Sequence, residues 1–131
     1  MFDLSGKTAL VTGASGGIGA AIAVALAKQG ANVALSGTRV EALEATRDLI
    51  GQDCPILPCR LDDAAAVDAL VGQAEATLGG RCDIVVSNAG VTKDGLLLRM
   101  KDEDWDRVIA LNLSAYFRLS RAALKGMMKR R

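Results

Sequence analysis

The stretch TALVTGASGGIG, residues 8–19, decides the fold of this chain. Residues 9–11 are apolar and predict a short buried strand, and the glycines that follow at the spacing G-x-x-x-G-x-G predict a tight turn that leads into a helix. A helix that begins at such a turn points its free N–H groups and the positive end of its dipole back at the turn. Strand, turn and helix together predict a binding site for the pyrophosphate of a dinucleotide. The alternative interpretation is a turn that only joins the strand to the helix.

The overall composition excludes several classes of function. The chain has 131 residues, half of them hydrophobic, and a formal net charge of +1, which predicts one domain with one core. So small a net charge offers no electrostatic reason to bind nucleic acid or a membrane surface. No apolar run reaches the roughly 18 residues that a membrane helix needs, and residues 1–5 lack the basic start and apolar middle of a signal peptide. We therefore expect a cytoplasmic protein.

The cysteines and the missing histidine restrict the chemistry further. Cys54, Cys59 and Cys82 are irregularly spaced, and the sequence contains no histidine. Because tetrahedral zinc sites are built from closely spaced Cys and His ligands, we expect no metal site and interpret the cysteines as reduced, partly buried thiols. A nucleophile activated by histidine is excluded as well.

Strands and helices alternate along the rest of the chain. Apolar residues at helical spacing, ended by glycines such as Gly30 and Gly51, predict a helix after each strand. The strands are predicted at residues 9–11, 33–35, 55–59 and 83–87, and the helices at 17–29, 40–50, 63–78, 102–112 and 114–131, with a bend or restart near Asn112. Pro55 and Pro58 remove backbone donors from the third strand and place it at an edge of the sheet.

This alternation predicts a parallel sheet with right-handed crossovers. We expect an α/β, Rossmann-like, doubly wound sheet, truncated to about four strands in the order 3-2-1-4, with helices on both faces. The direction of the strand order changes between strands one and four, and ligands of such sheets bind there, at the carboxyl ends of the strands. The glycine turn after strand one and Asn88-Ala89-Gly90 after strand four both belong to this place, so two separate features predict one site.

The end of the second strand indicates which dinucleotide is bound. NAD sites usually place a carboxylate there to bind the ribose 2′-hydroxyl, whereas this chain has Ser36-Gly37-Thr38-Arg39. A carboxylate would repel a 2′-phosphate, but an arginine and a hydroxyl hold one through charge-assisted hydrogen bonds. The segment therefore favours NADP(H) over NAD(H). The alternative for Arg39 is an ordinary solvated arginine in the first turn of a helix.

Three short motifs are similar to those of the short-chain dehydrogenases/reductases. The segment TGASGGIG at residues 12–19 resembles the family's T-G-x-x-x-G-x-G cofactor motif, SNAG at residues 87–90 resembles its N-N-A-G motif, and NLS at residues 112–114 resembles its N-x-S segment. Residues 90–131 are most similar to the bacterial 3-oxoacyl-acyl-carrier-protein reductases of fatty-acid synthesis. The resemblance covers the whole chain and implies that residues 1–131 are the NADP(H)-binding, N-terminal half of such a domain.

The resemblance also implies roles for single residues. Those that bind the cofactor phosphates or shape the turn around them are Gly13, Ala14, Ser15, Gly16, Gly17, Ile18 and Gly19. Those implied at the adenosine end are Thr38 and Arg39 for the 2′-phosphate and Arg60 and Leu61 for the adenine. Asn88 is implied at a cofactor ribose, and its motif neighbours Ala89 and Gly90 are implied cofactor-binding residues. Asn112 is the implied catalytic residue and would support a proton relay. Three positions depart from the family pattern. Relatives carry Asn in place of Ser87 and Asp or Asn in place of Arg60, and relatives that prefer NADP often carry Arg in place of Gly16.

The family's proton donor has no counterpart in this sequence. In the family a tyrosine is the general acid, a lysine four residues later lowers its pKa, and a serine polarises the carbonyl. Here the one tyrosine, Tyr116, is followed four residues later by Ser120, so we interpret Tyr116 as a core or helix-packing residue. We expect NADP(H) binding without turnover by this chain alone. The alternatives are an active oxidoreductase with an unusual acid or a second chain, and a non-enzymatic, homo-oligomerising module that no longer binds cofactor.

Self-association is expected from the last part of the chain. The final helix is predicted to expose Phe117, Leu124, Met127 and Met128, and the fourth strand is predicted to leave one edge unpaired. Because the family's main subunit contact is made by these last two helices, the resemblance implies a homodimer through them. The strand edge is the alternative contact.

Overall fold

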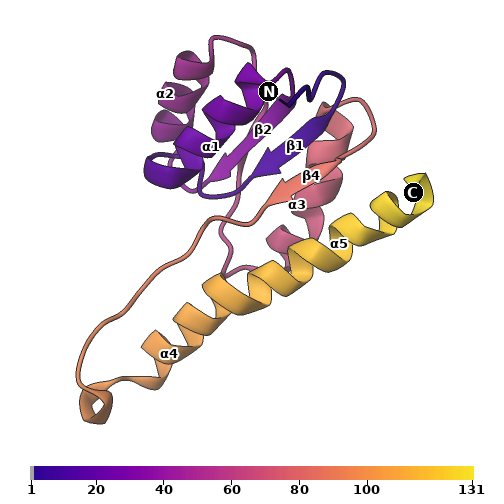
Figure 1. Cartoon of the computed structure of the whole chain (residues 1–131). Helices are drawn as coiled ribbons and strands as arrows, with labels where there is room; N and C mark the ends of the chain where they lie inside the picture. Colours follow the sequence, from indigo (N-terminus) through magenta and orange to yellow (C-terminus); the bar gives the residue numbers. More distant parts are fainter. Residues whose placement is uncertain (1) are drawn as a thin grey trace.

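A computed structural model describes residues 2–131 and shows a parallel sheet flanked by helices (Figure 1). Its strands lie in the order β3-β2-β1-β4, which confirms the predicted order and fold class. The strands of the described chain are β1 (Thr8–Val11), β2 (Asn32–Gly37), β3 (Ile56–Pro58) and β4 (Ile84–Val86). The helical elements of the same residues are α1 (Gly17–Lys28), α2 (Val40–Ile50), α3 (Ala64–Thr77), the 3₁₀ turn η1 (Leu97–Arg99), α4 (Asp102–Ile109), the π-helix η2 (Ala110–Ser114) and α5 (Ala115–Arg130).

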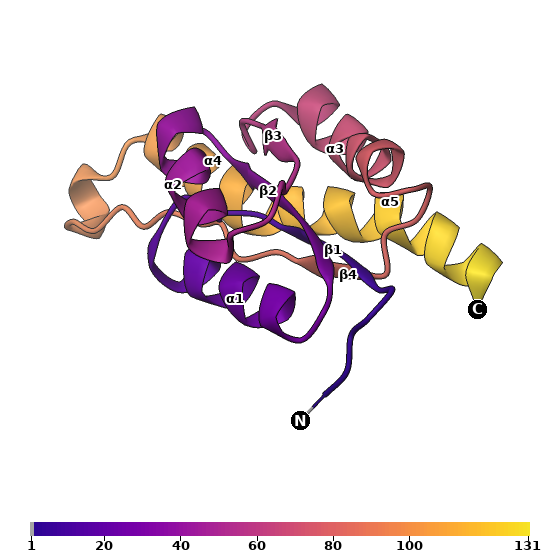
Figure 2. The same ribbon diagram turned by 90° about the horizontal axis from the view of Figure 1, so that it is seen from above.

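Both faces of the sheet are covered, because successive side chains of a strand point to opposite sides. On one face Leu10 and Ala34 pack with Val67 of α3 and Leu119 of α5. The other face has a core cluster that includes Ala9, Val11, Val33 and Leu35 of the sheet, Ala23 of α1 and Leu43 of α2. Figure 2 shows the sheet between the two pairs of helices, α1 with α2 and α3 with α5.

The two outer strands are short. β3 lies at one edge, as its prolines predict, and β4 lies at the other. β4 spans Ile84–Val86 rather than residues 83–87, because the pairing with β1 runs only from Ala9 opposite Ile84 to Val11 opposite Val86. Within residues 2–131, β4 has β1 as its only partner strand, so its outer edge is unpaired as predicted.

The C-terminal helices follow one another without a loop. The bend or restart predicted near Asn112 is a π-helical segment, η2, which joins α4 directly to α5. Figure 1 shows α4 and α5 as one long helix whose α4 end extends beyond the sheet, together with the loop that follows β4. Single π-helical turns inside helices are frequent at functional sites, and this one carries Asn112.

The exposure of the last helix differs from the prediction at two residues. Phe117, Leu124 and Met128 are exposed as expected, but Met127 is partly buried and packs against the core cluster between the sheet and α3. Tyr116 is not a core residue, because 55% of its surface is exposed. The reason is the phase of the helix: Ala115, Leu119 and Ala123 occupy the buried face, and Tyr116 lies one residue past it.

Candidate functional site

A cavity of about 200 Å³ lies at the carboxyl ends of the strands, where the sheet topology predicts a ligand site. Residues at or just after the ends of all four strands line it, together with one residue of α4 and one of η2. The lining is Gly13 and Ser15 after β1, Ser36, Gly37 and Thr38 at the end of β2, Cys59 and Leu61 after β3, Ala89, Gly90 and Val91 after β4, and Arg107 and Leu111. Six of the predicted site residues are therefore among those brought together here.

The glycine turn allows three segments to approach one another closely. Gly13 has a φ of +64°, and a Cβ there would lie 2.9 Å from the Cα of Ala89. A Cβ on Gly19 would overlap the carbonyl group of Gly13. Side chains at these two positions would push α1 and the loop after β4 away from the turn. The glycine spacing is thus required by the packing of strand, turn and helix.

Thr12 holds the turn against the loop that follows β4. Its hydroxyl accepts hydrogen bonds from the N–H groups of Asn88 at 3.1 Å and Ala89 at 3.2 Å. Its own N–H donates to the carbonyl oxygen of Val86 at 3.0 Å. The amide of Asn88 donates in turn to the carbonyl oxygen of Gly13 at 3.4 Å. These bonds keep the ends of β1 and β4 at a set separation beside the cavity.

The N-terminus of α1 has the properties of an anion site. No side chain caps it, and its first turn contains no acidic residue. Gly16 and Gly17 are exposed, and a Cβ on either would meet nothing within 4 Å. The first N–H groups of a helix have no partner inside the helix, and here neither a cap nor a carboxylate competes for them. This arrangement fits the pyrophosphate of a dinucleotide.

Two residues of the motif lie outside the cavity lining. Ala14 is fully buried, its N–H donates to Ser36 O at 3.0 Å, and its carbonyl accepts from the Thr46 hydroxyl at 2.7 Å. Its backbone groups are occupied, so Ala14 does not offer them to a phosphate. Ile18 is 73% exposed and does not line the cavity. The helix places its side chain on the outer surface because only one face of α1 meets the sheet.

The structure separates the residue pairs expected at the adenosine end. Thr38 and Leu61 line the cavity, but Arg39 and Arg60 do not. Arg39 is exposed at the start of α2. Arg60 pairs with Asp62 through two hydrogen bonds, of 2.9 and 3.2 Å, which lower the pKa of the Asp62 carboxyl and hold the arginine along the surface.

Asn112 uses its side chain to fasten the loop after β4 to η2. Its amide donates to the carbonyl oxygen of Val91 at 2.7 Å, and its carbonyl oxygen accepts from the N–H of Val91 at 2.8 Å. A Cβ on Gly90 would lie 2.9 Å from that oxygen. The Asn112 side chain therefore positions the cavity wall, and a part in proton transfer stays a prediction.

Six lining residues were missed by sequence reasoning. They are Ser36, Gly37, Cys59, Val91, Arg107 and Leu111. Ser36 and Gly37 could have been found, since they end β2 and the ends of strands form such cavities. Arg107 and Leu111 share one helix face at i, i+4 spacing, but their sequence does not reveal what that face meets. Cys59 is buried, and burial raises the pKa of its thiol, which keeps it neutral.

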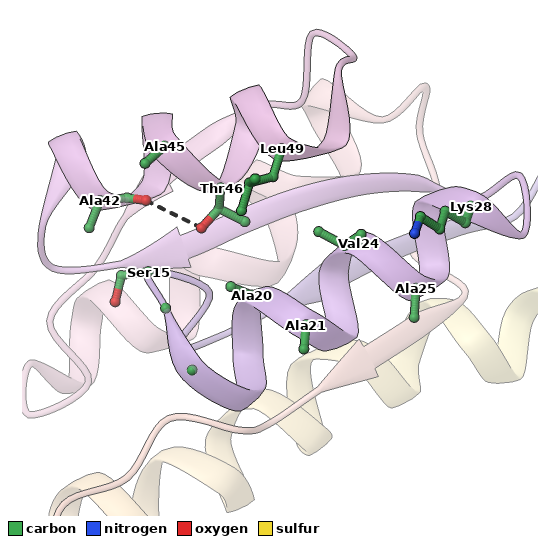
Figure 3. Close-up of a pocket in the computed structure, with 12 residues that line it drawn as sticks. Ser15, Ala20, Ala21, Val24, Ala25, Lys28, Ala42, Ala45, Thr46 and Leu49 are labelled. Atoms are coloured by element: carbon green, nitrogen blue, oxygen red, sulfur yellow. Dashed lines mark hydrogen bonds between the residues drawn. The ribbon is translucent and has the colours of Figure 1, made fainter.

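A larger hollow, of about 590 Å³, lies on the outer surface between α1 and α2. Figure 3 shows that its walls are mostly alanines and other short side chains, with Lys28 toward one end and Leu49 on the α2 side. Only Ser15, Gly16 and Gly17 connect it with the glycine turn. It offers few polar groups to orient a ligand, so we assign the site to the smaller cavity at the strand ends.

None of the helices in residues 2–131 combines the length and apolar character needed to cross a membrane. The same residues contain no group of three His, Cys, Asp or Glu side chains placed to hold a metal ion.

Comparison with known proteins places this geometry among related chains. Residues 7–131 match the family model described as short chain dehydrogenase. Nodulation protein G of Rhizobium sp. (strain N33) is 54% identical over 131 residues, all of this chain and 53% of the relative. The 3-oxoacyl-acyl-carrier-protein reductase FabG of Rickettsia bellii (strain RML369-C) is 49% identical over 131 residues, again all of this chain and 52% of the relative.

A solved structure extends the comparison to three dimensions. The crystal structure of a metagenomic short-chain oxidoreductase in complex with NADP is 42% identical, with a TM-score of 0.87 over 96% of this chain and 58% of that one. The chain spans about half the length of the curated relatives that it matches, and the match is to their N-terminal half.

Proposed function

Because this chain belongs to the short-chain dehydrogenase family, we propose that residues 1–131 form the NADP(H)-binding half of a carbonyl reductase domain. The observation that carries the proposal is the uncapped N-terminus of α1 beside a cavity lined by the carboxyl ends of the strands. The related metagenomic oxidoreductase, whose structure contains NADP, supports it.

Different residues would bind different parts of the dinucleotide. The N–H groups of Ser15, Gly16 and Gly17 would hold the pyrophosphate at the positive end of the α1 dipole. Gly13 and Gly19 would act through packing, by letting α1 and the loop after β4 approach the turn. Asn88, Ala89 and Gly90 would border the ribose next to nicotinamide. The bound cofactor would supply the hydride for reduction of a carbonyl carbon.

NADP(H) is the proposed cofactor rather than NAD(H). The end of β2 contains no carboxylate that would repel a 2′-phosphate, and Thr38 lines the cavity there. Arg39 follows on the exposed surface, where its guanidinium is free to turn toward a bound phosphate. The Arg60 guanidinium is paired with Asp62, so we do not assign it to the phosphate.

The whole relatives suggest the class of reaction. Similarity to FabG supports reduction of a 3-oxoacyl thioester, with Asn112 in a proton relay. The 131 residues contain no Tyr-x-x-x-Lys pair, since Ser120 stands four residues after Tyr116. We therefore propose that these residues by themselves bind NADPH without reducing a carbonyl.

The exposed apolar side chains support a homodimer. Trp105, Leu113, Phe117, Leu124 and Met128 are each more than half exposed along α4, η2 and α5. Apolar residues gathered along one helical unit usually mark a contact surface. Sedimentation equilibrium tests this part: a monomer at all concentrations would contradict it, whereas Phe117→Ser should weaken a dimer.

The central experiment is a fluorescence titration of the 131-residue protein with NADPH and, beside it, with NADH. We expect saturable binding that is tighter for NADPH. Arg39→Gln should weaken NADPH binding about 5-fold and leave NADH binding unchanged, because the lost contact is a charge-assisted hydrogen bond at an exposed site. A flat NADPH titration would contradict the proposed function.

A second assay addresses turnover. The protein is incubated with NADPH and an acetoacetyl thioester, and NADPH absorbance is followed. We expect no oxidation of NADPH. Turnover that disappears on replacing Asn112 or Tyr116 would instead favour the active oxidoreductase.

A further inference from the structure

Arg107 contributes the only charged side chain among the residues that line the cavity. It lies on α4, one helical turn before Leu111, so the two residues share the helix face that closes the cavity. Arg107 is exposed to solvent as well as lining the cavity. Within residues 2–131 this guanidinium has neither a hydrogen bond nor an ion pair to another side chain. An arginine beside an apolar-lined cavity, with its donors unused, is positioned to contact a ligand.

Neighbouring residues indicate which strand end lies nearest to Arg107. The pyrophosphate belongs to the turn after β1 and the adenosine ribose to the end of β2, so the base lies farther along, toward β3. Leu61, which follows β3, lines that part of the cavity. The neighbouring Asp62 has its pKa lowered by the hydrogen bond from Arg60 and, to a smaller extent, by the charge of Arg107. Arg107 is therefore near the β3 end, where the base belongs.

Arg60 cannot take this role in the observed arrangement. Its guanidinium is 2.9 Å from an oxygen of Asp62, its side chain is 73% exposed, and it does not line the cavity. The residue for which the resemblance implies an adenine contact is therefore bound to its neighbour Asp62 instead. A group on another element must supply a polar contact to the base if one is made.

We propose that Arg107 binds the adenine of the dinucleotide through its planar guanidinium, with Leu61 and Leu111 as the apolar surroundings. The assignment rests on the proposed function and adds a residue to it. A planar guanidinium stacks on aromatic rings and is attracted by their π-electrons. A lysine ammonium group carries the same charge but has no plane that can stack. The contact depends on the base, so it is shared by NADPH and NADH.

Titration of Arg107→Gln with NADPH and with NADH tests this directly. Both affinities should fall by the same factor, about 5-fold to 10-fold. Arg107→Lys should recover less than half of the loss, because it restores the charge without the plane. The matched control is Arg99→Gln, the same change of charge at an exposed residue of η1 outside the cavity, which should bind both dinucleotides like the wild type.

The outcomes separate this assignment from the proposed function. A loss confined to NADPH would overturn it, since Arg107 would then contact the 2′-phosphate. Unchanged binding in Arg107→Gln, or full recovery in Arg107→Lys, would overturn it while leaving the proposed function intact. A wild-type protein that binds neither dinucleotide would overturn both. Thermal unfolding should show no change of Tm in Arg107→Gln, because the exposed side chain has no partner to lose.

Discussion

Two threonines at opposite ends of β1 hold the same neighbouring strand in different ways. Thr8 and Thr12 are both buried, and both bond to the segments that flank β4. At the amino end, the N–H of Thr8 donates to the Asp83 carboxylate at 2.9 Å, and its hydroxyl donates to Arg81 O at 2.7 Å. At the carboxyl end, the Thr12 hydroxyl accepts from the N–H groups of Asn88 and Ala89 in the loop after β4.

The difference lies in charge. At the amino end the Arg81 guanidinium hydrogen-bonds the Asp83 carboxylate, so the charged groups that hold the strands satisfy one another. At the carboxyl end only neutral groups hold the strands, and the uncapped helix N-terminus beside them keeps its positive potential. A carboxylate there would occupy the N–H groups that a phosphate needs. One end of the strand pair serves stability, and the other is, in the proposed function, also the end that binds the dinucleotide.

The largest expected effect comes from adding a side chain in the glycine turn at the carboxyl end of β1. Gly13→Val places a branched side chain at a positive φ and within 3 Å of Ala89 Cα. We expect a loss of NADPH affinity of at least about 100-fold and of about 2–3 kcal/mol in the free energy of unfolding. Fluorescence titration and urea denaturation measure the two effects.

The control for this variant is Gly51→Val. Gly51 has a φ of +77° at the end of α2, but a Cβ there meets nothing within 4 Å. The Gly51→Val variant has the same kind of backbone strain as Gly13→Val but does not alter the site. Its NADPH affinity should therefore be that of the wild type. Unchanged NADPH binding by Gly13→Val would favour a module that does not use this turn.

The next effect compares the two threonines themselves. Thr12→Val and Thr8→Val keep the shape of the side chain and remove its hydroxyl, so each should lower the free energy of unfolding by about 2 kcal/mol. Only Thr12→Val should weaken NADPH binding, by about 10-fold, because it frees the loop at Asn88 beside the cavity. Denaturation and titration of both variants provide the test. Equal losses of affinity would show that the two ends do not differ as described.

A smaller effect concerns the stability of the fold at low pH. Burial acts to raise the pKa of Asp83, but hydrogen bonds from Arg81 and Thr8 outweigh it and lower that pKa below the ordinary 3.8. Because the folded pKa is the lower one, this stabilisation is complete above the unfolded value and is lost as the pH falls through the folded pKa. Asp83→Asn should therefore be less stable than the wild type at neutral pH, with the gap narrowing in acid.

Urea denaturation of both proteins between about pH 6 and pH 2 measures that gap. The variant retains every other carboxylate, so their shared titration cancels in the difference. A gap that widens in acid would contradict the assigned sign.

The smallest expected effect concerns Gly16, at the uncapped N-terminus of α1. Gly16 is extended, with a φ of 166° that any residue adopts, and a Cβ there meets nothing within 4 Å. Gly16→Arg should therefore fold normally and place a second guanidinium beside the uncapped N-terminus of α1. We expect NADPH binding to tighten about 3-fold and NADH binding to stay constant, measured by parallel titration. An equal gain for both dinucleotides would assign the new charge to the pyrophosphate.

Most of the fold could be read from short segments. The edge position of β3 and the glycine turn were predicted because each depends on local rules of proline and glycine. The strand order was predicted because alternating strands and helices with right-handed crossovers allow few topologies. The extent of β4 was not, since it depends on how many residues of β1 it faces. Within the site, Ala14 was assigned to the phosphates from its place in the motif, whereas its backbone groups are bound to Ser36 and Thr46.

The amino-acid sequence alone specified the chain's α/β alternation and the glycine turn at the start of α1, since backbone conformation and apolar spacing act between residues a few positions apart. Which arginine meets the cavity was decided only in three dimensions. Arg60 stands at the expected position and is held by Asp62, while Arg107, from a helix far along the chain, lines the cavity instead. Side-chain partners depend on distances between elements, and those distances exist only after the sheet and its helices have packed.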